Sequence, residues 1–170
     1  MSDDTVARRT AELQAFVAEH YRQVVGSVTL ITGDRATAED AVQEALVKAW
    51  RRGDEPVERL VAWITVVASN EARSKHRRRG AEERAYARLG ERGAGVDVRS
   101  EQLDTDLMAV LAGLPLRERQ AAVLFYVHDL SVADAAAALG VSDGSVKTLL
   151  SRARAHLAQA LGDQQEGGAA

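Results

Sequence analysis

Residues 131–154 read SVADAAAALGVSDGSVKTLLSRAR, in which a short apolar segment, a glycine-containing turn and a longer basic segment follow one another. The apolar spacing predicts a short helix over 131–139. Gly140 lies in the turn, and Ser142 is suited to cap a second helix over 143–161. These are the ingredients of a helix-turn-helix, a motif that places its second helix in the major groove of DNA.

The second helix of this motif presents polar and basic side chains on its outer turns. Such side chains can donate hydrogen bonds to phosphates or to base edges in a major groove. The predicted DNA contacts are Ser142, Ser145, Lys147, Thr148, Ser151, Arg152 and Arg154. An ordinary helical hairpin with a charged face is the alternative interpretation.

Outward from this motif, the whole chain shows helical periodicity, and we predict an all-α fold. Helices are expected over 4–20 and 21–31, which are nearly continuous, and over 37–50, 57–79, 103–111 and 117–128. Residues 81–102 lose the apolar pattern and carry several glycines, as linkers do. We therefore expect two small helical domains, the second a helix-turn-helix, joined by a flexible linker. The expected bounds are 1–80, a linker at 81–102, 103–161 and a flexible tail at 162–170.

The composition is that of a globular protein. Of 170 residues, 46% are hydrophobic and 28% charged, near globular averages. The absence of Cys excludes disulfides, Cys-bearing zinc sites and a thiol nucleophile. No apolar run reaches the ~18 residues of a membrane span, and the first residues do not resemble a secretory signal. We expect a cytoplasmic protein with no membrane span.

The segment 37–50 has the clearest amphipathic pattern in the chain. Thr37 and Asp40 have the spacing of a capping box. The apolar positions, which we expect to be buried, are Ala38, Ala41, Val42, Ala45, Leu46, Ala49 and Trp50. The opposite face is polar and includes Asp40, Gln43, Glu44 and Lys48.

Positive charge is concentrated at the end of the next helix. The net charge is -3, yet five cations fall within seven residues at 73–79: Arg73, Lys75, Arg77, Arg78 and Arg79. Cations also complement the dipole at a helix C-terminus, but capping needs fewer of them. The cluster therefore favours contact with phosphates, which would make binding depend on salt.

Catalysis has little support in the sequence. The four histidines are scattered, and none lies in a metal-binding or catalytic spacing. Neither a phosphate-binding glycine loop nor a dinucleotide motif is present. We expect no enzymatic activity, no catalytic residue, no metal and no cofactor.

Four segments together resemble the bacterial RNA polymerase sigma factors. TGD at 32–34 with AEDAVQEALVKAW at 38–50 resembles the sigma-two domain, as does AWI at 62–64 with the basic run after it. GLP at 113–115 with RQAAVL at 119–124 resembles the start of a sigma-four domain, which the helix-turn-helix completes. The short linker leaves no room for a sigma-three domain, and this is typical of the extracytoplasmic-function group.

The resemblance implies a transcription initiation factor that binds core RNA polymerase, directs it to promoters and helps to open promoter DNA. It implies that Asp40, Gln43, Glu44 and Lys48 dock on the clamp of the largest subunit. The resemblance also implies that seven residues contact the minus-ten element: Trp63, Asn70, Arg73, Ser74, Lys75, Arg77 and Arg78. The loop 51–56 would capture an unstacked base, and the linker would thread the active-site cleft. The helix-turn-helix would read the minus-thirty-five element, and 117–125 would lie near the flap of the second-largest subunit.

Several alternatives remain open at this point. A helix-turn-helix regulator that does not dock on polymerase is one rival, and a helical interaction protein without a DNA role is another. Leu149 stands where the family often has a basic residue, so it either turns inward or changes the DNA sequence read. An anti-sigma factor is a further candidate partner. An ATP-dependent protease that recognises Ala169-Ala170 is another candidate partner. The alternative is that these residues are part of an inert tail.

Overall fold

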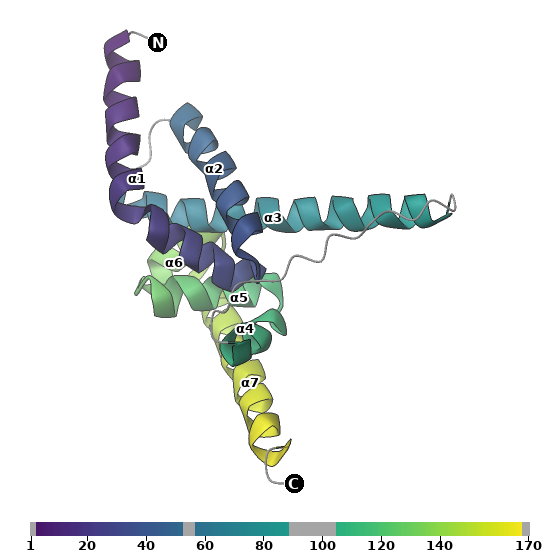
Figure 1. Ribbon diagram of the computed structural model, residues 1–170. Helices are drawn as coiled ribbons and strands as arrows, with labels where there is room; N and C mark the ends of the chain where they lie inside the picture. The colour runs from purple at the N-terminus through teal and green to yellow at the C-terminus, as the bar shows by residue number, and fades with distance from the viewer. Residues whose placement is uncertain (1–2, 53–56, 89–104, 168–170) are drawn as a thin grey trace.

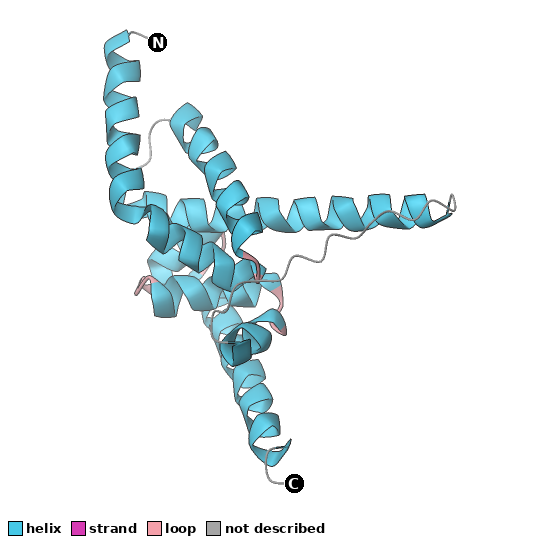
Figure 2. Cartoon of the chain, in the orientation of Figure 1, coloured by secondary structure: helices cyan, strands magenta, loops and turns pink. Residues whose placement is uncertain are grey.

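Every regular element of the computed structural model is helical, and no strand occurs in the residues that it describes, 3–52, 57–88 and 105–167 (Figures 1 and 2). The all-α prediction is confirmed. The helices are α1 (Asp3–Thr32), α2 (Arg35–Arg52), α3 (Val57–Arg88), α4 (Thr105–Ala112), α5 (Leu116–Ala122), α6 (Val132–Leu139) and α7 (Asp143–Gly167), with a π-helical turn, η1 (Val123–Val127), after α5.

Helices α1, α2 and α3 form the first domain around one apolar core. The first part of the predicted α2 stripe is buried, with Ala38, Ala41, Val42 and Ala45 nearly inaccessible to solvent, whereas Leu46, Ala49 and Trp50 are half-buried. It packs against α1 and α3, whose contributions include Val28 and Ile64. Small alanines on α2 let the three helices approach closely, and this leaves the polar side of α2 in solvent.

The junction between α1 and α2 is built by two adjacent residues. Gly33 has a φ of 83°, a left-handed conformation that suits glycine, and its N–H donates to the Thr29 carbonyl at 2.8 Å. Asp34 caps α2, because its Oδ2 accepts the Thr37 N–H at 2.7 Å. The predicted capping box from Thr37 to Asp40 is therefore wrong, and the cap lies one turn earlier.

Helices α4 to α7 form the second domain, and α6 and α7 confirm the helix-turn-helix. Ser131 caps α6, Gly140 takes a left-handed φ of 66°, and Ser142 Oγ accepts the Ser145 N–H at 3.2 Å to cap α7. Val146 of α7 is fully buried in the core of this domain. Leu149 is partly buried against the same core, so it turns inward.

Several helix ends differ from those predicted. The segments 4–20 and 21–31 form one helix, and α3 continues through Gly80 to Arg88. The end expected at Leu161 is also wrong, since α7 runs on to Gly167. Figure 1 shows the distal parts of α3 and α7 projecting from the rest of the molecule. Polar helix formers there sustain a helix without an apolar stripe.

The predicted helix 117–128 is interrupted by η1. The His128 N–H donates to the Val123 carbonyl at 3.1 Å, and the Leu130 N–H donates to the Leu124 carbonyl at 3.2 Å. Asp129 then takes a positive φ of 53°, which Asp tolerates better than most residues. This wider turn brings His128 to the surface that faces the first domain.

The two domains contact each other along a seam, which we define as the contact of α1 and α3 with α4, α5, η1 and α6. Ala62 and Val66 of α3 join the apolar core of the second domain. Leu30 of α1 packs against a smaller cluster that includes Leu111 and Ala153. No described helix combines the length and apolarity that a membrane span requires.

Candidate nucleic-acid interface

The outer face of α7 is open to solvent. All seven of its predicted DNA contacts are exposed: Ser142, Ser145, Lys147, Thr148, Ser151, Arg152 and Arg154. Their turns border a shallow hollow of about 550 Å³. The exposed polar surface around this hollow has the chemistry that phosphates and base edges require.

Only some of these side chains are uncommitted. Ser142 and Ser145 share a hydrogen bond between their hydroxyls at 2.9 Å, and Thr148 Oγ1 donates to the Gly144 carbonyl at 3.0 Å. In contrast, neither Lys147 nor Arg152 has a hydrogen bond or ion pair to another described residue. These two cations are therefore the side chains most available to DNA.

Arg117 of α5 lies beside the same hollow, although the sequence analysis did not include it among the DNA contacts. Its side chain is exposed and reaches the Leu139 carbonyl at 3.4 Å. Packing of α5 against α7 brings Arg117 to Arg152 and Ser142. The local pattern around Arg117 carried no signal for this, because the two segments are distant in sequence.

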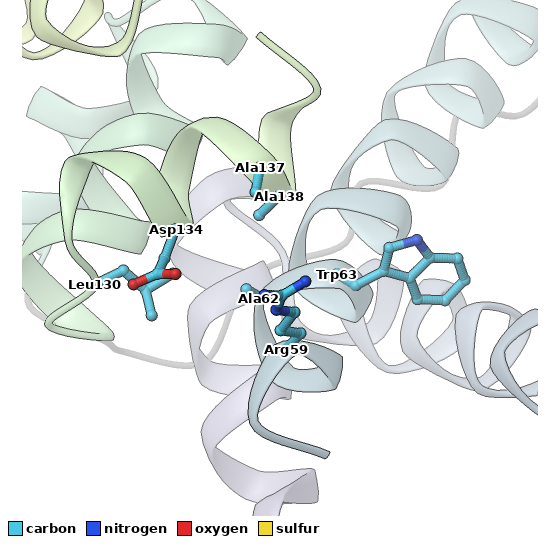
Figure 3. Close-up of a pocket in the computed structure, with 7 residues that line it drawn as sticks. All are labelled: Arg59, Ala62, Trp63, Leu130, Asp134, Ala137 and Ala138. Carbon is cyan, nitrogen blue, oxygen red and sulfur yellow. The ribbon is translucent and has the colours of Figure 1, made fainter. Parts of the chain in front are cut away.

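Trp63 of α3 is half-buried at the edge of the seam. The Arg52 guanidinium lies over its ring, 5.5 Å from the centroid, as in a cation–π contact. Beside Trp63 lies a pocket of about 350 Å³. Figure 3 shows Arg59, Ala62 and Trp63 of α3 on one side of this pocket and Asp134, Ala137 and Ala138 of α6 on the other.

Asn70, a predicted minus-ten contact, is engaged by the second domain. The Gln120 amide of α5 donates to Asn70 Oδ1 at 2.9 Å and to Ser69 Oγ at 2.7 Å. Gln120 is fully buried, and its own Oε1 has no hydrogen-bond partner. The seam thus occupies part of the face of α3 that the sequence analysis assigned to DNA.

The basic end of α3 extends past the seam. Arg73, Arg77 and Arg78 are exposed, whereas Ser74 and Lys75 are half-buried. Lys75 is ion-paired with Glu44 of α2. The cations that remain exposed follow one another along the projecting helix, an arrangement suited to a phosphate backbone.

The polar face of α2 is exposed and lies opposite the buried stripe. Asp40, Gln43, Glu44 and Lys48 share this face, and Lys48 is ion-paired with Glu71 of α3. Val47 lies among them and is 50% exposed. Val47 was not among the predicted contacts, and its side chain adds apolar area within this polar face.

His128 is an ionisable side chain within the seam. Its Nε2 lies 3.4 Å from Thr65 Oγ1 of α3, and its Nδ1 lies 3.4 Å from Gln23 Nε2 of α1. Burial lowers the pKa of His128, because the seam disfavours the charged imidazolium. The seam therefore favours the neutral form of His128.

The described residues contain no group of three His, Asp or Glu side chains placed to hold a metal ion. Three predicted features lie partly or wholly outside the described residues. They are the loop 51–56, from residue 53 onward, the linker 81–102, from residue 89 onward, and the pair Ala169-Ala170.

Two protein-family matches cover most of the chain. Residues 16–82 match the family described as Sigma-70 region 2. Residues 104–157 match Sigma-70 region 4. The first match corresponds to α2, most of α1 and most of α3, and the second includes the helix-turn-helix.

Known proteins also resemble the chain as a whole. It is 33% identical to ECF RNA polymerase sigma factor SigM of Mycobacterium tuberculosis, over 84% of this chain and 74% of SigM. It is 31% identical to ECF RNA polymerase sigma factor EcfG of Rhodopseudomonas palustris, over 77% and 75% of the two chains. Among solved structures, sigma factor RpoE in complex with the anti-sigma factor NepR from Bartonella quintana superposes with a TM-score of 0.69. That match has 29% identity and covers 88% of this chain and 96% of RpoE.

Proposed function

The chain belongs to the ECF RNA polymerase sigma factors, which direct RNA polymerase to promoters, and we propose that its two domains divide that work. In this proposal α2 docks on core polymerase, α3 contacts the minus-ten element and α7 reads the minus-thirty-five element. The observation that carries the proposal is that both outer faces, on α2 and on α7, are exposed while their opposite faces form the domain cores.

The docking surface on α2 consists of Asp40, Gln43, Glu44, Lys48 and Val47. Its polar side chains can pair with a complementary charged surface, and Val47 offers apolar area at its centre. We assign the clamp of the largest subunit as its partner and the flap of the second-largest subunit as the partner of α5. Both assignments follow from the sigma-factor resemblance.

The DNA surface on α3 is assigned from the sigma-factor resemblance, and the one on α7 is supported by its charge and exposure. On α3 the minus-ten contacts are Trp63, Asn70, Arg73, Ser74, Lys75, Arg77 and Arg78. On α7 the uncommitted cations Lys147 and Arg152 anchor the minus-thirty-five contact, and Arg117 adds a phosphate contact beside them.

Run-off transcription with core RNA polymerase tests this proposal. Adding the protein should start RNA at defined sites, which a helix-turn-helix regulator without polymerase docking cannot do. Gln43→Ala with Glu44→Ala should weaken core binding measured by fluorescence anisotropy. The thermal unfolding curve should shift only slightly, because the ion pair that Glu44 forms with Lys75 is partly exposed. Arg8→Ala is the control, because Arg8 is exposed on α1 and away from the assigned surfaces. Equal core affinity of the double variant and the wild type would contradict the docking assignment.

We further propose that the protein acts in the cytoplasm, where RNA polymerase is found, and contributes no catalytic residue of its own. We also propose a separate inhibitory protein as a partner, because the similar RpoE structure contains the anti-sigma factor NepR. Co-purification from the native cell tests this, and recovery of polymerase subunits alone would count against such an inhibitor.

The remaining proposed partner is an ATP-dependent protease that recognises Ala169-Ala170. Small apolar C-terminal residues are the feature that supports it. Replacing both alanines with Asp should lengthen the half-life in cells. An unchanged half-life would instead identify an inert tail.

A further inference from the structure

A further hollow, distinct from the α7 surface and from the pocket beside Trp63, lies in the seam between the two domains. Its volume is about 470 Å³, within the range of small-molecule sites. It is lined by the end of α1, the start of α2 and the middle of α3 from the first domain. The second domain contributes Ala112, Leu116 and Arg119.

Arg119 is held in this hollow by backbone groups alone. Its guanidinium donates to the Ile31 carbonyl at the end of α1 and to the carbonyls of Ala112 at 3.1 Å and Leu114 at 2.8 Å. Its Nε is buried and has no hydrogen-bond partner. Arg119 therefore crosses the seam without an ion pair to any other described residue.

Arg73 of α3 faces the same hollow from the first domain. Burial, and then the charge of Arg73, lower the pKa of Arg119, so the two guanidinium groups repel each other. Neither has a carboxylate at ion-pair distance among the described residues. The imidazole of His76 lines the hollow together with these two guanidinium groups.

One carboxylate, that of Asp34, is found among the described residues that line the hollow. Its Oδ2 accepts the Thr37 N–H and caps α2, and it forms no ion pair with Arg73 or Arg119. The hollow thus carries a net positive charge that the described residues leave uncompensated. Such a site favours an anion.

We propose that this hollow binds a small organic phosphate, which bridges Arg73 of the first domain and Arg119 of the second. The two guanidinium charges match a phosphate dianion, and the planar donors of Arg73, which make no hydrogen bond to another described residue, match its oxygens in shape. Arg119, held by the three carbonyls, supplies the opposing positive charge. Ile31, Ala72 and Leu116 provide an apolar lining for the organic part of the ligand.

A ligand held from both sides stabilises the arrangement in which the domains touch. Binding energy that exists only when Arg73 and Arg119 face each other shifts the equilibrium toward this arrangement. The site therefore makes contact between the domains responsive to phosphorylated metabolites. This inference concerns the protein alone and goes beyond the proposed division of work at promoters.

Isothermal titration calorimetry of the full chain with pyrophosphate and with guanosine diphosphate, at constant ionic strength, tests the site. Saturable binding at one site is expected, with tighter binding of the diphosphate ester if the apolar lining contributes. Arg73→Gln should weaken binding at least tenfold, whereas Arg79→Gln should change it less than twofold. Arg79→Gln is the matched control, because it removes the same charge from an exposed position on the same helix.

Two outcomes overturn the site: no saturable binding of either probe, or an equal loss of affinity in both variants, which would reveal general attraction to a basic helix. A second measurement tests the bridge. Because the chain has no Cys, Gln14→Cys and Gln159→Cys provide dye positions on α1 and α7 for energy transfer. Pyrophosphate should narrow the distribution of energy-transfer efficiencies between the two dyes. It should leave that distribution unchanged in a labelled protein that also carries Arg73→Gln. Binding without this change would overturn the bridging role.

Discussion

The two surfaces assigned to DNA differ in how much of each is available. On α7 every assigned side chain is exposed, and the uncommitted cations Lys147 and Arg152 face solvent. On α3 the second domain engages Asn70 through Gln120, and α6 lies across a pocket from Trp63. Basic and polar side chains therefore form an open surface on α7, whereas on α3 part of the assigned surface is in contact with the second domain. If DNA contacts α3 as assigned, full contact requires the seam to separate.

The seam has the composition of an interface that can open. Its apolar contacts from α3 come from the small side chains Ala62 and Val66. Two polar atoms in it, Gln120 Oε1 and Arg119 Nε, are buried without a partner. Each such atom costs free energy that water would recover on separation, so the seam is weaker than the core of either domain.

The largest effect is expected on the open surface. Lys147→Ala with Arg152→Ala should reduce promoter-directed transcription by roughly 10- to 100-fold, since specific DNA contacts contribute about 1–3 kcal/mol each. Run-off transcription at fixed salt measures this, and Arg8→Ala on α1 is the control. Transcription within twofold of the wild type would remove α7 from the assigned DNA interface.

The seam itself is tested by Val66→Asp. Val66 is 6% exposed and belongs to the cluster that joins the domains, so a carboxylate there should separate them, at a cost of about 3 kcal/mol to the closed arrangement. The radius of gyration from small-angle X-ray scattering should increase while helix content by circular dichroism is retained. Val47→Asp, the same change at an exposed valine, should leave the radius unchanged. An unchanged radius in the Val66 variant would show that the seam does not depend on this contact.

A smaller effect is expected from Gln120→Ala. This variant leaves Ser69 and Asn70 without their shared donor, and we expect a loss of about 1–2 kcal/mol in the free energy of unfolding by urea. Asn70→Ala alone should cost less, because Asn70 is half-buried and can reach water. If the two substitutions prove fully additive, the hydrogen bond between them contributes nothing and the proposed sharing of α3 fails.

The smallest effect concerns pH. Burial lowers the pKa of His128 in the folded protein, so the unfolded state, with a pKa of about 6.5, binds the proton more readily. Stability from neutral His128 is therefore complete above about pH 6.5 and is lost as the pH falls toward the folded pKa. His128→Gln should flatten the decrease in Tm between pH 7.5 and 5.5. His76→Gln, at an exposed position, should preserve the decrease, and the same slope in both variants would contradict the role of His128.

The helix-turn-helix and the α2 stripe were predictable because they depend on local spacing. An apolar period of 3.6 residues forces one face of a helix inward, and Ser142 or Gly140 acts within a few residues of its own position. The same reasoning failed for the cap of α2, where Asp34 and Thr37 are both suitable and only the backbone path selects between them. It also failed at Gly80 and Leu161, because one glycine or the loss of an apolar stripe does not end a helix built from strong helix formers.

The sequence by itself therefore determined the helical class, the basic character of the two surfaces assigned to DNA and the polar face of α2. Only the tertiary structure decided that Gln120 bonds to Asn70, that His128 lies between α1 and α3, and that Arg119 faces Arg73. The physical reason is that periodicity shows that a side chain is buried but not which distant segment covers it. Partners that lie far apart in the chain meet only when both domains have folded and the seam has formed.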